Sequence, residues 1–478
     1  MSRETWLCIP LGCILAGCAV GPNYKRPVVS APPAFRGQAV AESDSFADLA
    51  WWEAFPDPGL AALLKETLAN NNDLRTAVAR VEQARNLVAV ARSGYYPVIG
   101  YDAGAQRDRG VFKSNPELSL PGNGQTQTQN LFLAGLSTAW EADIWGRIRR
   151  ANEAALAEFL ATEDGRRGLM LSLVSETAQA YFELQELDRR LSIAQNSTSA
   201  FQSTYALFNR RYGAGITSRL AVTRAESALA EATGTVADIE RQIAVKEHQI
   251  SVLLGRNPGA IQRPSPGSEA MVPPAIPAGL PSSLLERRPD LLEAEQSLVA
   301  ASARIGIARA DFFPRIGLTA LFGRVSPELT ALTSGSAAIF ALALEGAGPI
   351  FTGGQLTAQY RAAVAAFEQT RFQYLQGTLR AFQEVSDALV SEQKLTELEN
   401  QQNREVTALN DSVTIANKRY RGGLASYYEV LEAQQLLFPA EIALSQTRRD
   451  RLLAVVQLYK ALGGGWKMTD TQWVQGHP

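Results

Sequence analysis

Two stretches of this chain, Asn209-Arg-Arg-Tyr-Gly-Ala-Gly-Ile-Thr217 and Asn417-Lys-Arg-Tyr-Arg-Gly-Gly-Leu-Ala425, are near copies of each other. They lie 208 residues apart, and the same offset relates Gly146 to Gly354. A repeat of this length is too long for a short-period solenoid. The duplication therefore predicts one body built from two similar halves, related by a pseudo-symmetry axis.

A second offset is found upstream, where Gly94-Tyr-Tyr-Pro97 resembles Asp311-Phe-Phe-Pro314. These motifs are 217 residues apart, so the second half is nine residues shorter between the proline and the following glycine. We expect this deficit to lie in the second loop. The two repeats are expected to cover residues 57–255 and 283–463, with a Pro-rich, non-helical connector over 256–282.

The composition argues against a nucleic-acid partner. The chain has 478 residues and a formal net charge of −2, and its basic residues are scattered singly or in pairs. Nucleic-acid binding normally requires a basic patch or stripe. The length would suit two or three ordinary domains, but the duplication favours one integrated body.

The three cysteines all lie near the start of the chain, at Cys8, Cys13 and Cys18. A basic residue, an apolar run and small residues are typical of a secretory signal peptide, which we expect over residues 1–17. Leu15-Ala-Gly-Cys18 resembles a bacterial lipobox, in which the cysteine becomes the lipidated first residue. We predict that Cys18 carries palmitate and that 18–56 is an extended tether. The alternative is an ordinary cleaved signal with a chance cysteine.

Alternating apolar residues predict two β-hairpins, at about 98–143 and 315–347, with a polar loop over 107–130 in the first. Each strand is expected to have about ten residues, which suits a tilted strand of a transmembrane barrel. No apolar run of about 18 residues follows the signal, so a membrane could be crossed only by a closed barrel. Four strands cannot close a barrel. An oligomer must therefore complete the wall, or the hairpins are soluble.

The rest of the sequence predicts long helices. Helical periodicity begins near Asp57, runs over 60–91 and stops at Pro97. A long helical stretch then extends from Gly146 to Tyr212, with a heptad seam from Leu173 to Tyr212. The fold class is therefore mainly α with a transmembrane β part and an internal duplication.

Each long helix is expected to end at a Gly-bearing tip, at 213–217 and 421–425, because glycine suits the positive φ angles that end helices. Return helices are predicted at Ser218–Leu254 and Ser426–Leu462. Residues 464–478 form a C-terminal tail.

The sequence offers no convincing catalytic or metal site. His248 and His477 are the two histidines, and neither lies near a cysteine or a carboxylate cluster. Gly346-Ala-Gly348 resembles part of a phosphate loop, but Pro349 interrupts it and no Gly-Lys-Ser/Thr follows. No nucleophile motif is present. We therefore expect no enzyme activity and no cofactor.

Four further motifs follow one another along the chain: Cys18-Ala-Val-Gly-Pro-Asn-Tyr-Lys-Arg-Pro27, Trp51-Trp-Glu-Ala-Phe-Pro-Asp-Pro-Gly-Leu60, Asn72-Asp-Leu-Arg-Thr-Ala77 and Leu285-Glu-Arg-Arg-Pro-Asp-Leu291. In this order they resemble the outer-membrane efflux channel family, the TolC-like outer membrane factors, and in particular its lipoprotein branch. The resemblance covers nearly the whole mature chain.

The resemblance implies a homotrimer in the outer membrane of a Gram-negative cell, with a lipid anchor and the helical part in the periplasm. Three chains would form a twelve-stranded β-barrel and a long α-helical barrel. A periplasmic adaptor protein would join this duct to an inner-membrane pump, commonly proton-driven. The expected function is passive export of small toxic compounds. The alternatives are a duct for type I protein secretion and a periplasmic coiled-coil scaffold without a pore.

The resemblance also assigns roles to two sets of residues. The tips are expected to dock the adaptor, through Gly213, Gly215, Thr217, Gly422, Gly423, Leu424 and Ser426. A periplasmic constriction is expected to be formed by Tyr420, Glu429 and Glu432. A ring of such carboxylates from three chains would favour cations; the alternative is a solvated acidic helix face.

This chain departs from the family pattern around the constriction. The family more often has Asp where the two glutamates stand, and some members carry Arg where Ala425 stands. Arg419 or Arg421 could replace that cation. In the first half, Arg219 and Arg224 are predicted as partners for the glutamates.

Overall fold

The computed structural model describes residues 19–36, 45–49, 51–111, 126–263, 277–279 and 281–465. The predicted signal peptide, Cys18, His477 and part of the predicted connector lie outside the described residues. The chain divides into two compact units, which are taken separately. Unit 1 comprises Met1–Pro27, Glu82–Ala161 and Glu295–Gln373, and unit 2 comprises Val28–Val81, Thr162–Ala294 and Tyr374–Pro478.

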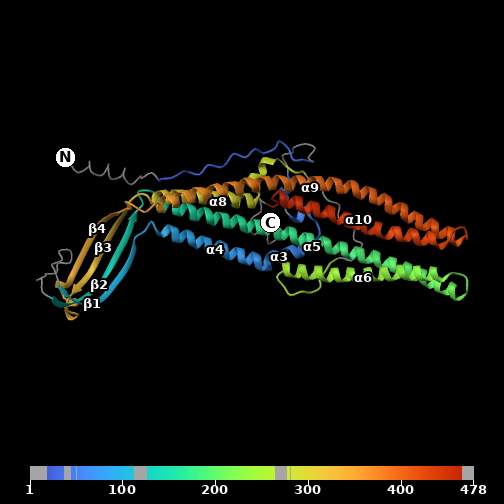
Figure 1. Ribbon diagram of the computed structural model, residues 1–478, viewed down its shortest axis with the longest axis horizontal. Helices are drawn as coiled ribbons and strands as arrows, with labels where there is room; N and C mark the ends of the chain where they lie inside the picture. The colour runs from blue at the N-terminus through green and yellow to red at the C-terminus, as the bar shows by residue number, and fades with distance from the viewer. Residues whose placement is uncertain are drawn as a thin grey trace. The chain divides into compact units, whose positions relative to one another are not determined.

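The helices of the two halves match in length (Figure 1). There are 22 residues each in α4 (Asn72–Ser93) and α8 (Pro289–Ala310), 67 each in α5 (Arg147–Gly213) and α9 (Gln355–Arg421), and 35 each in α6 (Arg219–Leu253) and α10 (Tyr427–Ala461). At 1.5 Å per residue, α5 and α9 are each about 100 Å long. None of the described helices has a stretch long and apolar enough to cross a membrane.

The described part of unit 1 contains a four-stranded antiparallel sheet in the order β1-β2-β3-β4. Its strands are β1 (Val98–Val111), β2 (Thr126–Ala142), β3 (Arg315–Ser326) and β4 (Ala338–Ala347). Tyr101 lies opposite Leu136, and Phe322 lies between Leu136 and Phe340. Since alternate residues share a face, the predicted apolar faces of the four strands form one surface.

The first hairpin is longer than the sequence predicts. β1 and β2 have 14 and 17 residues, whereas β3 and β4 have 12 and 10, against the ten expected for each. The loop expected over 107–130 is wrong in extent, because the ladder continues to the pair Val111 and Thr126. Backbone pairing persists there although the side chains have become polar.

The nine-residue difference between the halves is not confined to a loop. In the second hairpin, the short helix η5 (Gly335–Ala337) stands where the first hairpin still has paired strands, and η4 (Thr330–Thr333) lies before it in the connection. The missing residues therefore come from the distal strand ends as well as from the turn.

The helix predicted at 60–91 is also wrong in one respect, because it is broken at Asn71. The helix α3 (Pro58–Asn70) ends there and α4 begins. The buried Asn71 side chain accepts the N–H of Leu74 at 3.0 Å, which caps α4, and donates to the Leu253 carbonyl at 2.9 Å. The apolar spacing continues through the break, so periodicity could not locate it.

Arg288 lies at the equivalent break between helices in the second half, 217 residues after Asn71. We call these two breaks, at Asn71 and at Arg288, the joints. Arg288 lies between α7 (Leu284–Arg287), which follows η3 (Pro281–Ser283), and α8. Its guanidinium donates to the Ala461 carbonyl at 3.1 Å. Ala461 lies 208 residues after Leu253, so different side chains make equivalent backbone contacts in the two halves.

An aromatic core in unit 2 includes part of the predicted tether. The rings of Phe46, Phe55 and Tyr459 meet edge to face, with centroids 5.6 to 6.3 Å apart. These residues belong to η1 (Phe46–Asp48), the turn after α2 (Trp51–Ala54) and α10. Burying each ring contributes about 1.5–3 kcal/mol. The tether predicted as extended over 18–56 therefore ends in short helices that pack into the core.

Candidate functional site

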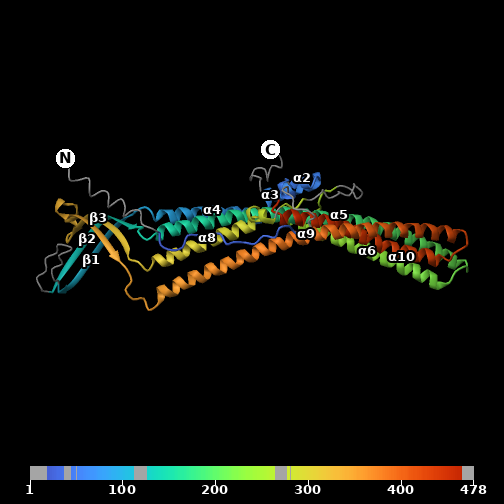
Figure 2. The same ribbon diagram turned by 90° about the horizontal axis from the view of Figure 1, so that it is seen from above.

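The two predicted tips have the same backbone. Ile216 and Leu424 each donate an N–H to the carbonyl five residues earlier, at 2.9 Å. Gly215 and Gly423 have φ angles of +75° and +71°, a conformation that favours glycine. Both turns lie at the same end of unit 2 (Figure 1, Figure 2).

Each tip presents one large aliphatic side chain to solvent. Ile216 is 71% exposed and Leu424 is 76% exposed. Leu424 was expected at a docking surface, and the repeat offset could have added Ile216. Of the other predicted residues, Gly213 ends α5, Gly422 follows α9, Thr217 is half-buried and Ser426 takes the N-cap position of α10.

Tyr420 lies at the centre of a contact between the two long helices. The Arg211 guanidinium donates a hydrogen bond to the Tyr420 hydroxyl. The same guanidinium carbon lies 5.2 Å from the centre of the Tyr420 ring. This arrangement joins the last turn of α5 to the last turn of α9 by a hydrogen bond and a cation–π contact.

Tyr427, the first residue of α10, extends this contact into a ring cluster. Its ring meets Tyr420 edge-on at 4.9 Å and Phe208 at 4.8 Å. Its hydroxyl is hydrogen-bonded to the Thr204 hydroxyl on α5. Burial raises the pKa of the Tyr427 hydroxyl, so the group stays neutral at physiological pH. The cluster fastens α9 and α10 to α5 beside the tips.

The two predicted glutamates differ in their surroundings. Glu429 forms an ion pair with Arg419 at 3.8 Å, while Glu432 is exposed. Both partners of the pair are about half exposed, so the pair contributes little to stability. Arg224, predicted as a partner for the glutamates, lies instead over the Tyr428 ring at 5.8 Å.

Sequence reasoning missed Arg211, Thr204, Phe208 and Tyr427 as members of this site. One signal was available, since Arg211 recurs as Arg419 in the second copy. Arg211 contacts the neighbouring tip region through Tyr420, whereas Arg419 pairs with Glu429 across its own tip. The partners could not be found from spacing, because they lie on different helices.

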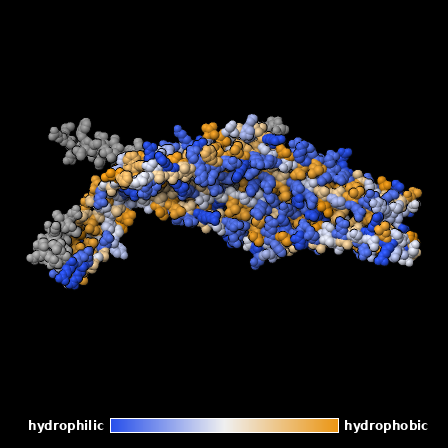
Figure 3. Space-filling view, viewed as in Figure 1, coloured by the Kyte–Doolittle hydropathy of each residue, from blue (hydrophilic) through white to orange (hydrophobic). Residues whose placement is uncertain are grey.

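The sheet of unit 1 has two unlike faces. Its large apolar side chains are 54% to 84% exposed: Ile99, Tyr101, Leu136, Phe322, Phe340, Leu342 and Leu344. Figure 3 shows hydrophobic residues gathered along the strands. The opposite face forms a hollow of about 410 Å³, lined mainly by small residues such as Gly100, Ser137, Thr319 and Ala343. An exposed apolar surface of this kind marks a membrane or partner contact.

Aromatic residues gather where the strands meet the helices. Trp145 stacks on Phe313 with centroids 4.5 Å apart, and its indole donates to the Pro314 carbonyl at 2.8 Å. The indole of Trp140 donates to the Tyr95 carbonyl at 3.0 Å. Such amphipathic rings are enriched at membrane–water interfaces.

The residues after Cys18 are hydrogen-bonded to this group of aromatic residues. The Val20 N–H donates to the Trp145 carbonyl at 3.0 Å. Further along, the Arg26 guanidinium donates to Glu295 on α8 at 2.6 Å. Gly21 has a φ of +104°, and an added Cβ would lie 2.6 Å from the Gly306 Cα. The segment is thus held at several points. Cys18 itself lies outside the described residues.

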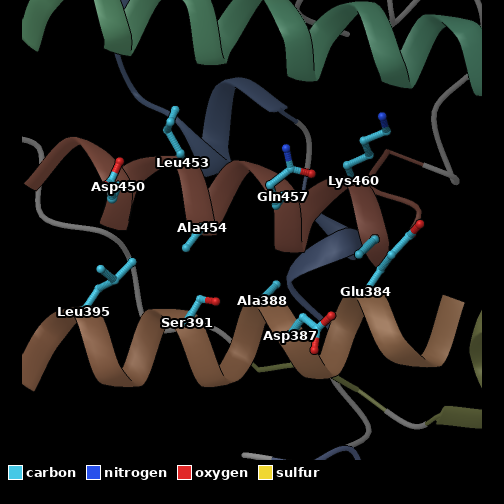
Figure 4. Close-up of a pocket in the computed structure, with 11 residues that line it drawn as sticks. Glu384, Asp387, Ala388, Ser391, Leu395, Asp450, Leu453, Ala454, Gln457 and Lys460 are labelled. Carbon is cyan, nitrogen blue, oxygen red and sulfur yellow. The ribbon is translucent and has the colours of Figure 1, made fainter. Parts of the chain in front are cut away.

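A groove of about 420 Å³ lies between α9 and α10 in unit 2, and its lining residues are drawn in Figure 4. Ala388 and Ala454 face each other across it, and Glu384, Asp387 and Lys460 line its exposed rim. Glu384 is already bound to Arg288 at 2.7 Å. The groove is a packing seam between two helices. No group of His, Cys, Asp and Glu side chains among the described residues could hold a metal ion.

Comparison with known families gives one match across both halves. A family model described as "Outer membrane efflux protein" matches residues 63–256 and 280–464. The "Cation efflux system protein CusC" of Escherichia coli (strain K12) is 32% identical over 461 residues, which cover 96% of this chain and 98% of that protein. The "Probable efflux pump outer membrane protein TtgC" of Pseudomonas putida is 34% identical over 462 residues, with coverage of 95% and 94%.

Solved structures show the same similarity. The outer-membrane channel OprN superposes with a TM-score of 0.86 at 30% identity, covering 94% of this chain and 100% of that one. The open state of the MtrE outer membrane channel of Neisseria gonorrhoeae gives a TM-score of 0.82 at 29% identity, covering 94% and 99%.

Proposed function

This chain belongs to the outer membrane efflux protein family and is an outer-membrane exit duct for efflux, and on that premise we propose that three copies assemble into one channel. The observation that carries the proposal is the four-stranded sheet with one exposed apolar face. Three such sheets would supply twelve strands, enough for a closed barrel. The large apolar side chains would face lipid and the small ones the lumen.

The tips are the docking surface for a periplasmic adaptor in this proposal. Three copies would present six tips, each with an exposed aliphatic side chain, either Ile216 or Leu424. The adaptor would join the duct to an inner-membrane pump, commonly one driven by protons. The duct itself would export passively.

The ring cluster acts as the closing contact in this proposal. Arg211, Tyr420 and Tyr427 hold α9 and α10 against α5. Glu429 and Glu432 follow directly on one face of α10, at the i, i+3 spacing. Releasing the cluster would let the second helical hairpin move, and the glutamates would then line a cation-favouring mouth.

The cargo would be small toxic compounds, chosen mainly by the pump. The relatives of this chain are named for different cargoes, including cations and toluene. A common duct serving unlike pumps needs a wide, weakly selective lumen. The small side chains on the inner face of the sheet are consistent with such a lumen.

The pore is tested with the purified full-length protein in planar bilayers and on gels. We expect single-channel conductance, and a band of three chains in unheated samples that becomes one chain on boiling. A periplasmic scaffold would show neither. Absence of both properties would contradict the proposal.

The acidic mouth is tested with Glu429→Ala and Glu432→Ala, singly and together. Removing up to six carboxylates should lower the preference for cations, measured from reversal potentials in a salt gradient. Glu405→Ala, an exposed position on α9, serves as the matched control. Unchanged selectivity in the double variant would leave the glutamates as a solvated helix face.

The lipid anchor is tested with Cys18→Ser. Radioactive palmitate should label the wild-type chain and not the variant. Continued labelling of the variant would show that the lipid is attached elsewhere.

A further inference from the structure

The large apolar face of the sheet carries charges of one sign only. Because alternate residues of a strand share a face, Arg107 and Arg109 lie on this face with Tyr101. Arg324 lies there too, on the same face of β3 as Phe322. Within the described strands, every charged residue of the apolar face is therefore an arginine.

The opposite face, around the hollow, carries the carboxylates of the strands: Asp102, Asp108, Glu141 and Glu345. Its one arginine in the described strands, Arg315, forms an ion pair with Asp311 at 3.1 Å. Asp108 follows Arg107 directly, but it accepts a hydrogen bond from Gln106 on its own face at 2.6 Å. The carboxylates of the sheet thus leave the arginines of the apolar face uncompensated.

Arg107 and Arg109 lie at the far edge of the apolar surface. At about 3.4 Å per residue, they lie about 27 and 34 Å along β1 from Ile99, which is next to the helices. With a strand tilt of about 40°, the depths are about 21 and 26 Å, and the apolar band of such a barrel is about 25 Å tall. Figure 3 shows hydrophilic residues at this distal end of the strands, beyond the hydrophobic ones.

Two polar residues of β2 lie beside the arginines. Asn130 is opposite Arg107, and Thr128 is opposite Arg109. All four side chains are exposed. Among the described residues, neither arginine has an ion-pair or hydrogen-bond partner. These four residues form a polar patch with two uncommitted guanidinium groups.

The second half has no such patch. Arg324 is the counterpart of Arg107, and its guanidinium donates to two carbonyls of the following connection, at 3.3 and 2.7 Å. The counterpart of Arg109 is Ser326, which is buried. The second half therefore uses its arginine to hold its own connection, whereas the first half presents two arginines outward.

We propose that Arg107 and Arg109, with Thr128 and Asn130, bind the phosphate groups of lipopolysaccharide, the glycolipid of the outer leaflet. The inference rests on the proposed trimeric barrel, which sets this patch against lipid. Arginine binds phosphate through paired, charge-assisted hydrogen bonds. The Cα atoms of the two arginines are about 7 Å apart along the strand, so both long side chains can reach one phosphate. The neighbouring amide and hydroxyl supply further donors.

The proposal is tested with full-length trimers in detergent, by native mass spectrometry of bound lipid A, the phosphorylated part of this glycolipid. Arg107→Gln with Arg109→Gln removes both charges and keeps the strand polar. We expect lipid A to bind at least about ten-fold more weakly. Arg361→Gln with Arg380→Gln, at two exposed positions of α9, is the control with the same change in net charge.

Two further probes identify the ligand. Dephosphorylated lipid A should bind the wild type as weakly as lipid A binds the double glutamine variant. Inorganic phosphate at the concentration of the lipid should not displace lipid A, because it lacks the acyl chains that lie on the apolar face. Equal binding of the two lipids would overturn the proposal, and so would displacement by inorganic phosphate.

The variants also separate binding from assembly. Arg107→Lys with Arg109→Lys keeps the charges without the paired hydrogen bonds, so its affinity should fall between those of the wild type and the glutamine variant. If the double glutamine variant does not migrate as a heat-labile trimer, each single variant should still lose about three-fold in affinity. Unchanged binding in variants that form trimers would overturn the inference, whereas a wild type that forms no trimer would overturn the proposed function.

Discussion

The two halves of this chain share their backbone and differ in the side chains placed on it. The tips have the same hydrogen bonds, yet Tyr427 stands where the first half has Arg219. The joints make the same carbonyl contact, through Asn71 in one half and Arg288 in the other. The comparison indicates that the duplicated framework is kept, while the second half carries the ring contacts of Tyr427 that we propose as the closing contact.

The largest effect is expected at the glycines after the return helices. Gly255 and Gly463 have φ angles of +71° and +74°. An added Cβ at Gly255 would overlap the Asn70 carbonyl oxygen, whereas at Gly463 it would lie 3.1 Å from the Arg287 oxygen. Gly255→Ala should cost about 3 kcal/mol of unfolding free energy, and Gly463→Ala about 1–2 kcal/mol.

Thermal unfolding in detergent measures this difference. Gly423→Ala is the control, because an added Cβ there meets open space and only the backbone conformation is strained. Equal losses for Gly255→Ala and Gly423→Ala would show that the close approach to Asn70 is unimportant.

The next effect concerns the joints. Arg288→Ala should destabilise by about 2 kcal/mol, because it removes the donor for the Ala461 carbonyl and leaves that buried oxygen unsatisfied. Arg288→Asn copies the first half, where an asparagine makes the equivalent bond. We expect Arg288→Asn to recover at least half of the unfolding free energy that Arg288→Ala loses, as measured by denaturant titration. If both variants unfold alike, the two joints are not interchangeable.

At the tips, a residue of the first half can be placed at the equivalent position of the second half. Tyr427→Arg copies the first half and removes the ring contacts with Tyr420 and Phe208. We expect resting conductance in planar bilayers to rise about five-fold, corresponding to about 1 kcal/mol. Tyr212→Phe, at the first-half counterpart of Tyr420, should leave conductance unchanged. A Tyr427→Arg channel that stays closed would place the closing contact elsewhere.

The smallest effect concerns Glu186, a buried residue whose counterpart Lys394 is exposed. Burial raises the pKa of Glu186 above its ordinary value of 4.5, although Arg190 and Arg449 lie 3.7 and 3.5 Å away. The folded state therefore binds this proton more tightly than the unfolded state. Protonation of Glu186 therefore adds to the free energy of unfolding at low pH, and this contribution is lost as pH rises through the raised pKa.

Glu186→Gln removes this dependence. Its unfolding temperature, relative to wild type, should increase from pH 5 to pH 8 by about 1–2 °C. Lys394→Gln should show no such trend. A difference that shrinks as pH rises would mean that the arginines outweigh burial and lower the pKa.

The sequence allowed the repeat, the helix ends and the alternation of the strands to be predicted, because each is a local signal. The return helices α6 and α10 begin one residue after the predicted Ser218 and Ser426, which take the N-cap positions. The break at Asn71 escaped, because its cause is a hydrogen bond to Leu253, far away in the chain. The polar continuation of β1 and β2 escaped because backbone pairing needs no apolar pattern.

The candidate site was only partly visible for the same reason. Tyr420 and Glu429 were named from family resemblance, and the structure gives each an arginine partner, Arg211 and Arg419. Their pairing depends on which helices lie side by side. Spacing along one helix carries no such information.

The equal length of α5 and α9 restricts how this protein can change in evolution. One residue inserted into α5 alone would advance everything beyond it by 1.5 Å and rotate it by about 100°. Phe208 and Arg211 would then turn away from Tyr427 and Tyr420, although every residue of the site was still present. Insertions and deletions are therefore tolerated where the two halves already differ in length, at the distal ends of the hairpins, and the long helices can lengthen only together.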